Sequence, residues 1–413
     1  MGRQTATLGK ILNRHAFLFI WALGTLLRLA QILGSRPHPA RDLSELELTA
    51  RSLILHGTLG NPYLHNSGPS AHVSPIAPLV LAVLYAMFGT DSNGQLAQRI
   101  AGAVAASAQY ALLPAVAQSL GLVRIVGIVA GLAGALLPYK GYIETVDTVW
   151  EQPYVALVYV LLFLHTVQGW TKKNNGSAPA RGLLWGFAIL LSPTFGLVFV
   201  AVLAYEFFSM KRRNGLILVI ACAALVQVPW IARNWIQLGG FVPARSNFGL
   251  EFSLSNRIDA HPLMEDNISD GALSRFHPSH NQEQWQQLRE QGEVAYNRIL
   301  LNNAVHEIAS NPPHFLRLTG QHIWRFWWWP SHRKGTTLAT LLVTALGLLG
   351  LRRLPATDAR NLIGLILLAY PLIYYLIEVD RRYRYPIEWI FMLGAAVYLL
   401  PLSRTQNSPT QAG

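Results

Sequence analysis

The stretch 41-RDLSELELTARSLILHGTLGNPYLHNSGPSAHVSPIAPLVLAVLYAMFG-89 contains the most informative pattern in the sequence. It follows an apolar stretch at 15–33 and begins with an acidic amphipathic segment, which is followed by a turn region rich in glycine, proline and asparagine. It ends in an apolar segment at 74–89. Ionisable groups placed beside a membrane are costly, so they are often functional. The stretch therefore predicts a polar site at a membrane surface.

The acidic segment reads as a helix with one apolar and one polar stripe. Asp42 and Glu45 share the polar face, and Gly57 suits the C-terminal cap. Glu47 lies four residues before Arg51, which predicts an ion pair on the helix surface. Two interpretations of Asp42 and Glu45 stay open. They are functional carboxylates, or they form a capping box with Asp42 as the N-cap and Glu45 at the third helical position.

Composition sets the class of the protein. Of the 413 residues, 52% are hydrophobic and only 13% are charged, which excludes a soluble enzyme of ordinary type. We predict an all-α polytopic membrane protein with about 10–11 membrane segments, amphipathic juxtamembrane helices and one large external loop. The candidate spans are 15–33, 95–119, 120–138, 153–170, 214–236, 336–350, 360–378 and 386–402, with a hairpin at 182–208 broken at Ser192-Pro193. The single cysteine, Cys222, excludes an intramolecular disulfide.

The distribution of lysine and arginine predicts the orientation, because basic residues gather on the cytoplasmic side. The basic groups are Lys10 and Arg14; Lys172, Lys173 and Arg181; Lys211, Arg212 and Arg213; and Arg352, Arg353 and Arg360. Segments 34–72, 139–152, 237–335 and 378–385 then face the external side. If 75–89 crossed the membrane completely, every later segment would have the opposite orientation. We therefore expect 75–89 to be re-entrant or oblique. The predicted organisation is an N-terminal transmembrane catalytic module (1–236), an external polar loop or cap (237–335), C-terminal transmembrane segments (336–403) and a polar tail (404–413).

A second acidic group occurs in the loop YKGYIETVDTVWEQPY, predicted to be external. Glu144, Asp147 and Glu151 fall at helical spacing on one face, with Lys140 as the nearby base. They form either a solvated polar edge or part of a water-filled functional cavity.

Cationic residues gather on the same predicted side. In the stretch 228–256, Arg233, Arg245 and Asn247 could form a cradle for an anionic headgroup, although arginines at a span end also snorkel to lipid phosphates. In IEVDRRYRYPIEW, Arg382 and Arg384 occupy alternate positions of a stretch read as extended, which would point both the same way towards an anionic ligand. The alternative is compensation of the arginines by Glu378, Asp380 and Glu388.

The sequence predicts neither a metal nor a cofactor. His277 and His280 lack a third ligand at convincing spacing, and there is no glycine-rich phosphate loop. The net charge of +12 fits membrane lipids as partners, and we expect no nucleic-acid partner.

The order of these motifs resembles the membrane glycosyltransferases of the GT-C class. Within that class, the chain is similar to bacterial relatives of protein O-mannosyltransferases and of the lipid A aminoarabinose transferase. The resemblance rests on the acidic loop leading into Ala50-Arg51-Ser52-Leu53, on GPSAHVSPIAPLVLAVLYAMFG (68–89), and on the later PWIARNW, FVPARSNFGLEF and DRRYRYPIEW. The chain lacks an adjacent Asp-Glu pair, because Leu43 follows Asp42, and Ser74-Pro75-Ile76 replaces a fuller proline motif.

The resemblance implies transfer of a sugar from a polyprenyl-phosphate donor to an acceptor hydroxyl on a glycan, lipid or protein. A carboxylate base would be Asp42 or Glu45, of which Glu45 is preferred because it lies inside the helix, and a second acid would be Glu144, Asp147 or Glu151. Arg233, Arg245, Asn247, Arg382 and Arg384 would hold the donor phosphate, without a metal. The implied location is the periplasmic face of a bacterial inner membrane. The alternatives are a lipid-linked oligosaccharide transporter and a polysaccharide polymerase or ligase.

Overall fold

Four helices are long and apolar enough to cross a membrane in the computed structural model, which describes residues 2–34, 43–137, 150–171, 178–328 and 334–400. The first is the part of α1 (Gly2–Gly34) that follows a kink at His15, and the second consists of α4 (Ser92–Ala111) continued by α5 (Leu113–Ser119). The others are α8 (Gln152–Thr171) and α11 (Leu216–Leu238). The chain is an integral membrane protein.

Shorter helices complete the apolar bundle. They are α3 (Ile76–Phe88), α6 (Arg124–Leu136), α9 (Ala178–Leu191), α10 (Thr194–Ala204), α18 (Lys334–Leu351), α19 (Asp358–Ala369) and α20 (Glu388–Leu399). The predicted break at Ser192-Pro193 is confirmed, since α9 and α10 meet there. The predicted span 360–378 is not one α-helix, because a 3₁₀ helix at Tyr370–Tyr375 follows α19.

Glycines let α18 and α20 pack at very short range. A Cβ atom on Gly350 would lie 1.7 Å from the carbonyl oxygen of Gly394, so neither position leaves room for a side chain. Close backbone approach at small residues is a common way for helices to associate in membranes, where lipid offers no hydrophobic driving force. Away from such contacts, apolar side chains point outward, as Ile217 (84% exposed) and Ile236 (81% exposed) do on α11. These outward faces are suited to contact lipid.

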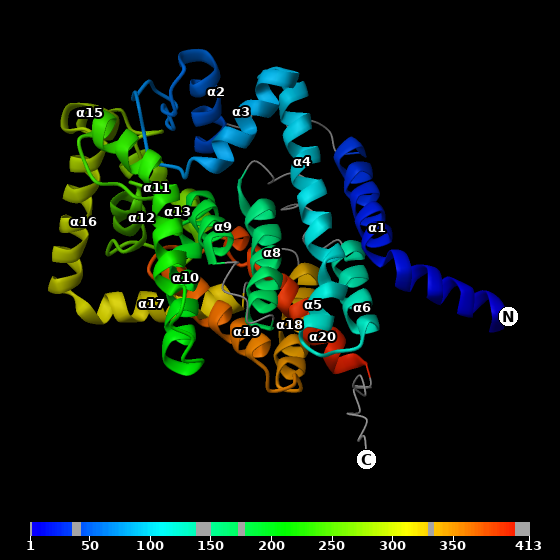
Figure 1. Ribbon diagram of the computed structural model, residues 1–413. Helices are drawn as coiled ribbons and strands as arrows, with labels where there is room; N and C mark the ends of the chain where they lie inside the picture. The colour runs from blue at the N-terminus through cyan, green and yellow to red at the C-terminus, as the bar shows by residue number, and fades with distance from the viewer. Residues whose placement is uncertain (1, 35–42, 138–149, 172–177, 329–333, 401–413) are drawn as a thin grey trace.

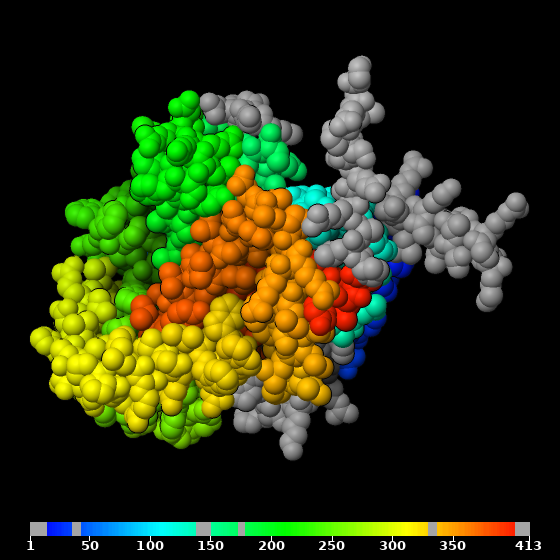
Figure 2. Space-filling model, turned by 90° about the horizontal axis from the view of Figure 1, so that it is seen from below, coloured from blue at the N-terminus to red at the C-terminus, as the bar shows by residue number. Residues whose placement is uncertain are grey.

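The helix α2 (Glu45–His56) lies in the upper part of Figure 1. Residues 239–328, here called the cap segment, form α12 (Phe248–Ser255), α13 (Met264–Ser269), α14 (Ala272–Phe276), α15 (Gln282–Gln291), α16 (Glu293–Ser310) and α17 (Pro312–Trp327). The sequence of 281–309 contains amphipathic helical stretches, and α15 and α16 form there. Figure 2 shows α16 and α17 as a yellow band along one edge, beside the orange α18 and α19.

Three segments distant in sequence meet at α2, which belongs to the first of them. Residues 43–75, here called the first loop, bind the cap segment: Ser246 N–H donates to the Ala71 carbonyl (2.9 Å), and Ala71 N–H donates to the Glu293 carboxylate (2.7 Å). Residues 376–387, here called the C-terminal loop, join the cap segment through Val379, whose N–H donates to the Pro262 carbonyl (2.9 Å). The site described next lies where these segments meet.

Candidate active site

The first turn of α2 frees Glu45 from any capping role. Ser44 is the N-cap, and it forms the capping box with Glu47: Ser44 N–H donates to Glu47 Oε2 (2.9 Å), and Glu47 N–H donates to Ser44 Oγ (3.3 Å). The prediction of Asp42 as N-cap with Glu45 as its partner is therefore wrong, because the helix begins two residues later. Glu47 is fully buried in this capping box instead of lying on the surface. The C-terminal cap at Gly57 (φ 69°) is confirmed.

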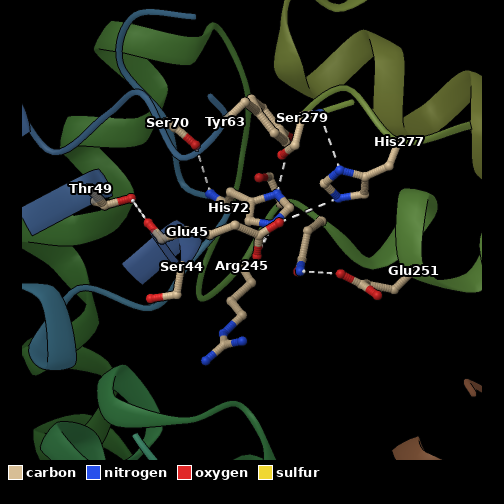
Figure 3. Close-up of polar contacts among 12 residues, drawn as sticks. Ser44, Glu45, Thr49, Tyr63, Ser70, His72, Arg245, Glu251, His277 and Ser279 are labelled. Atoms are coloured by element: carbon tan, nitrogen blue, oxygen red, sulfur yellow. Dashed lines mark hydrogen bonds and ion pairs between the residues drawn. The ribbon is translucent and has the colours of Figure 1, made fainter. Parts of the chain in front are cut away.

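Glu45 lies between two histidines that come from different segments (Figure 3). Its Oε2 is 2.9 Å from His72 Nε2 in the first loop, and its Oε1 is 3.3 Å from His277 Nε2 in the cap segment. His72 is fully buried, whereas the Glu45 side chain is 19% exposed. The carboxylate is thus fixed in position and still accessible.

Hydrogen bonds at the far side of each ring assign the histidines a supporting role. His277 Nδ1 accepts from the backbone N–H of Ser279 (3.2 Å), so the proton of a neutral ring sits on Nε2, which points at Glu45. His72 Nδ1 contacts the hydroxyl of Tyr63 (3.0 Å). Because both Nε2 atoms face Glu45, the carboxylate is the group in this trio best placed to take a proton from a ligand.

The charges of the trio are coupled. Burial alone would raise the pKa of Glu45, but His72 and His277 outweigh burial and hold the pKa well below its ordinary value. Burial alone would lower the pKa of His72, but the charge of Glu45 raises this pKa above its ordinary value. Glu45 is consequently ionised at neutral pH.

A polar cavity of about 220 Å³ opens beside Glu45. Glu251 of α12 and Glu378 of the C-terminal loop also line it. Burial and the charge of Glu45 raise the pKa of Glu251, while burial and the charge of Glu251 raise the pKa of Glu378 to about 7. Buried carboxyl groups so close together favour the protonated state. The ionised carboxylate of Glu45 therefore shares this cavity with Glu251 and Glu378, two acids that hold protons more readily than an ordinary glutamate.

A second cavity, of about 350 Å³, adjoins the first. Much of its lining is apolar, including Pro193, Leu197, Phe248, Ile373 and Ile377. The two cavities share the residues Glu151, Gln152, Arg245, Asn247, Glu251 and Tyr383, which we call the neck. A molecule with a polar head and an apolar tail could occupy both cavities at once.

Arg245 is the cation of the neck. Its guanidinium pairs with Glu151 Oε1 and donates from Nε to Ser74 Oγ (3.1 Å). The charge of Glu151 outweighs burial and raises the pKa of Arg245. Asn247 also lies at the neck and donates to Glu251 Oε1 (3.2 Å).

The other predicted cationic residues have different positions. Arg382 lines the polar cavity, with its guanidinium 4.0 Å from the ring centre of Trp150 and 3.8 Å from Asp380. Arg233 lines neither cavity and donates to the carbonyls of Ser70 (2.8 Å) and Leu59. Arg384 is 4% exposed, lines neither cavity and pairs with Glu388 (2.9 Å).

The extended conformation predicted for this arginine stretch is wrong. A 3₁₀ helix at Arg381–Tyr383 and another at Tyr385–Ile387 turn the chain, so Arg382 and Arg384 point to different surroundings. Of the predicted acids, Asp42, Glu144 and Asp147 lie outside the described residues.

Sequence reasoning missed His72, Gln152, Glu251 and Glu378 as parts of the site, and noted His277 only as a poor metal ligand. The available signal was weak: His72 lies inside SAHVSP, a stretch singled out for other reasons. Within the described ranges, no group of three or more histidine, cysteine or acidic residues is arranged to hold a metal ion.

No protein-family model and no curated protein matches this sequence. Solved structures do match. The apo oligosaccharyltransferase of Archaeoglobus fulgidus superposes with a TM-score of 0.57 at 12% identity, over 94% of this chain and 50% of the other. The archaeal oligosaccharyltransferase AglB of Archaeoglobus fulgidus, in complex with an inhibitory peptide and a dolichol-phosphate, gives a TM-score of 0.55 at 12% identity, over 94% of this chain and 50% of the other.

ArnT of Cupriavidus metallidurans, bound to undecaprenyl phosphate, gives a TM-score of 0.44 at 14% identity, over 93% of this chain and 78% of the other. The chain spans about half the length of the oligosaccharyltransferase structures. The two oligosaccharyltransferase structures confirm the predicted fold class: the chain has the GT-C fold.

Proposed function

We propose that this protein is a glycosyltransferase that moves a sugar from a polyprenyl-phosphate donor to an acceptor hydroxyl on a glycan, lipid or protein. The observation that carries the proposal is the neck, where a polar cavity containing Glu45 joins an apolar cavity. The polyprenyl tail would occupy the apolar cavity, the phosphate would lie at the neck, and the sugar would enter the polar cavity. The fold supports this assignment, since AglB, which shares it, was solved with a dolichol-phosphate.

Glu45 would act as the general base. The acceptor hydroxyl gives its proton to the Glu45 carboxylate while its oxygen forms a bond to the anomeric carbon of the sugar. The bond between that carbon and the phosphate oxygen breaks, and its electron pair leaves with the lipid phosphate. The low pKa of Glu45 keeps the base ionised, and its contacts with His72 and His277 hold it in place.

Arg245 would stabilise the departing phosphate, with Arg382 as a second cation on the wall of the polar cavity. Preorganised cations aimed at developing negative charge lower a reaction barrier effectively in a site that excludes water. Glu151 keeps the Arg245 guanidinium in position through its Oε1 atom. We therefore assign the donor phosphate to Arg245 rather than to Arg384, which lines neither cavity.

Vesicles provide the test. The purified protein is reconstituted with sugar-bearing undecaprenyl phosphates and candidate acceptors, and the release of free undecaprenyl phosphate is measured by mass spectrometry. We expect release that depends on the acceptor. Movement of the intact sugar lipid across the vesicle membrane, without cleavage, would contradict the proposal and identify a transporter.

We also propose that the site faces the periplasm from an inner membrane. In a Cys222→Ala background, a cysteine at Gln282 in the cap segment should react with a membrane-impermeant thiol reagent added to spheroplasts. A cysteine at Asn214, beside the basic Lys211–Arg213 cluster, should stay unlabelled. The reverse pattern would place the site on the cytoplasmic face.

A further inference from the structure

Gln152 is a buried glutamine at the neck. It is the first residue of α8, only 6% of it is exposed, and it lines the neck. Its Oε1 atom is buried and has no hydrogen-bond partner among the residues that the structure describes. Burying a carbonyl oxygen without a partner costs free energy, so native proteins seldom do it unless a ligand or water completes the bond.

The neighbouring acid shows the same feature. Glu151 is 5% exposed and uses Oε1 to bind Arg245, while its Oε2 is buried and has no hydrogen-bond partner within the described part of the chain. Two consecutive residues thus offer hydrogen-bond acceptors at the neck. Both residues line the neck, so a ligand that carries two hydrogen-bond donors could satisfy both acceptors.

The chemistry of the donor identifies that group. The ionised phosphate group of the donor has only acceptor oxygens. It can therefore bind Arg245, but it cannot donate a hydrogen bond to Gln152 Oε1 or to Glu151 Oε2. A polyprenyl tail has no polar hydrogen. A sugar hydroxyl can donate, and an amide such as Gln152 can also return a hydrogen bond from its NH₂ group.

We propose that Gln152 is a substrate-binding residue that accepts a hydrogen bond from a hydroxyl of the donor sugar, with Glu151 Oε2 accepting from the adjacent hydroxyl. This inference rests on the proposed function and adds a specificity: the donor sugar carries two neighbouring free hydroxyls. Gln152 selects the sugar, and Arg245 holds the phosphate regardless of which sugar is attached.

Gln152→Leu tests this assignment, because leucine has a similar volume and no hydrogen-bonding group. The affinities of the wild type and the variant are measured by calorimetry for bare undecaprenyl phosphate and for a panel of undecaprenyl-phosphate sugars. We expect the variant to bind the bare lipid as the wild type does and to bind the preferred sugar lipid about 2- to 12-fold more weakly. For an analogue of that lipid that lacks one of the two hydroxyls, the affinities of the wild type and of Gln152→Leu should differ less.

Gln227→Leu is the matched control. Gln227 is similarly buried (9% exposed), but it lies in α11 away from both cavities and donates to the Gly186 carbonyl (2.8 Å). Its loss should not change the preference for sugar lipid over bare lipid.

Equal affinities of the wild type and Gln152→Leu for the sugar lipid would overturn the inference. So would equal losses for the bare and the sugar lipid, because they would indicate a structural role. Neither result affects the proposed function, which fails only if the wild type does not cleave the donor.

Discussion

The neck and the C-terminal loop each contain an arginine paired with a buried glutamate, but their surroundings differ. At the neck, Arg245 pairs with Glu151 beside two cavities, and Glu151 Oε2 has no hydrogen-bond partner among the described residues. In the C-terminal loop, Arg384 pairs with Glu388, and its NH1 and NH2 groups donate to the Trp327 carbonyl (2.6 Å) and to Thr344 Oγ1 (2.5 Å). All three nitrogens of that guanidinium contact protein.

The difference shows that a buried charge does not by itself identify a binding site. Arg384 and its partners connect α17, α18 and α20, so the pair stabilises the packing of these helices. From the sequence, Arg384 was a candidate for binding the donor phosphate. Binding requires a polar group that still has hydrogen-bonding capacity and faces a space large enough for a ligand. The neck meets both conditions.

The largest effect should come from Glu45→Gln, which keeps the shape of the side chain and removes the proton acceptor at the cavity. We expect the transfer rate to fall about 10²- to 10⁴-fold while donor affinity changes little. Initial rates and calorimetric binding measure both quantities.

Glu47→Gln is the matched control on the same helix, because glutamine can also serve in a capping box. Its transfer rate should stay close to that of the wild type. A Glu45→Gln variant with full activity would show that Glu45 is not the base.

Lysine substitutions compare the two arginine pairs directly. Arg245→Lys should weaken donor binding about 10- to 100-fold, because an ammonium group cannot reproduce the forked hydrogen bonds of a guanidinium. Arg384→Lys should instead lower the free energy of unfolding by about 1–3 kcal/mol and leave donor affinity unchanged. Donor titrations and thermal denaturation in detergent distinguish the two. Loss of donor affinity in Arg384→Lys but not in Arg245→Lys would contradict the assignment of the donor phosphate to Arg245.

A smaller effect concerns pH. The pKa of Glu378 is raised to about 7 by burial and by Glu251 and Asp380, against the opposing effects of Asn267 and Arg257. A carboxyl group that binds its proton more tightly in the folded protein stabilises the fold at low pH, and this stability is lost as pH rises from its unfolded pKa through about 7. The wild type should lose on the order of 2–3 kcal/mol of its free energy of unfolding as pH rises, and Glu378→Gln should abolish this loss.

Melting temperatures measured between pH 5 and pH 8 test this expectation. The wild type should lose stability across the range, and the Glu378→Gln curve should be flatter. Parallel curves would show that Glu378 does not titrate in this window.

Hydropathy and spacing predicted much of the fold, because long apolar segments in a membrane protein have few alternatives to helix. The break at Ser192-Pro193 was predicted for the same local reasons. The capping box was not, since Asp42-x-x-Glu45 and Ser44-x-x-Glu47 both fit the pattern and only the tertiary contacts decide between them.

The site was predictable only in part. Glu45 and Arg245 were singled out from the sequence because acids and arginines beside apolar spans are unusual, and both line the polar cavity. His72, His277 and Gln152 reach Glu45 or the neck through folding of three separate segments, and nothing in the local sequence around them marks this. Arg384 shows the opposite error: its local sequence indicated a ligand-binding residue, but its position is internal.

The most direct test of the account is a structure of the protein with undecaprenyl phosphate, determined by electron cryomicroscopy in nanodiscs. The account predicts density for the phosphate within hydrogen-bonding distance of the Arg245 guanidinium, with the first isoprene units in the apolar cavity and Glu45 facing the open polar cavity. A phosphate bound at Arg384, or a lipid that leaves both cavities empty, would contradict it.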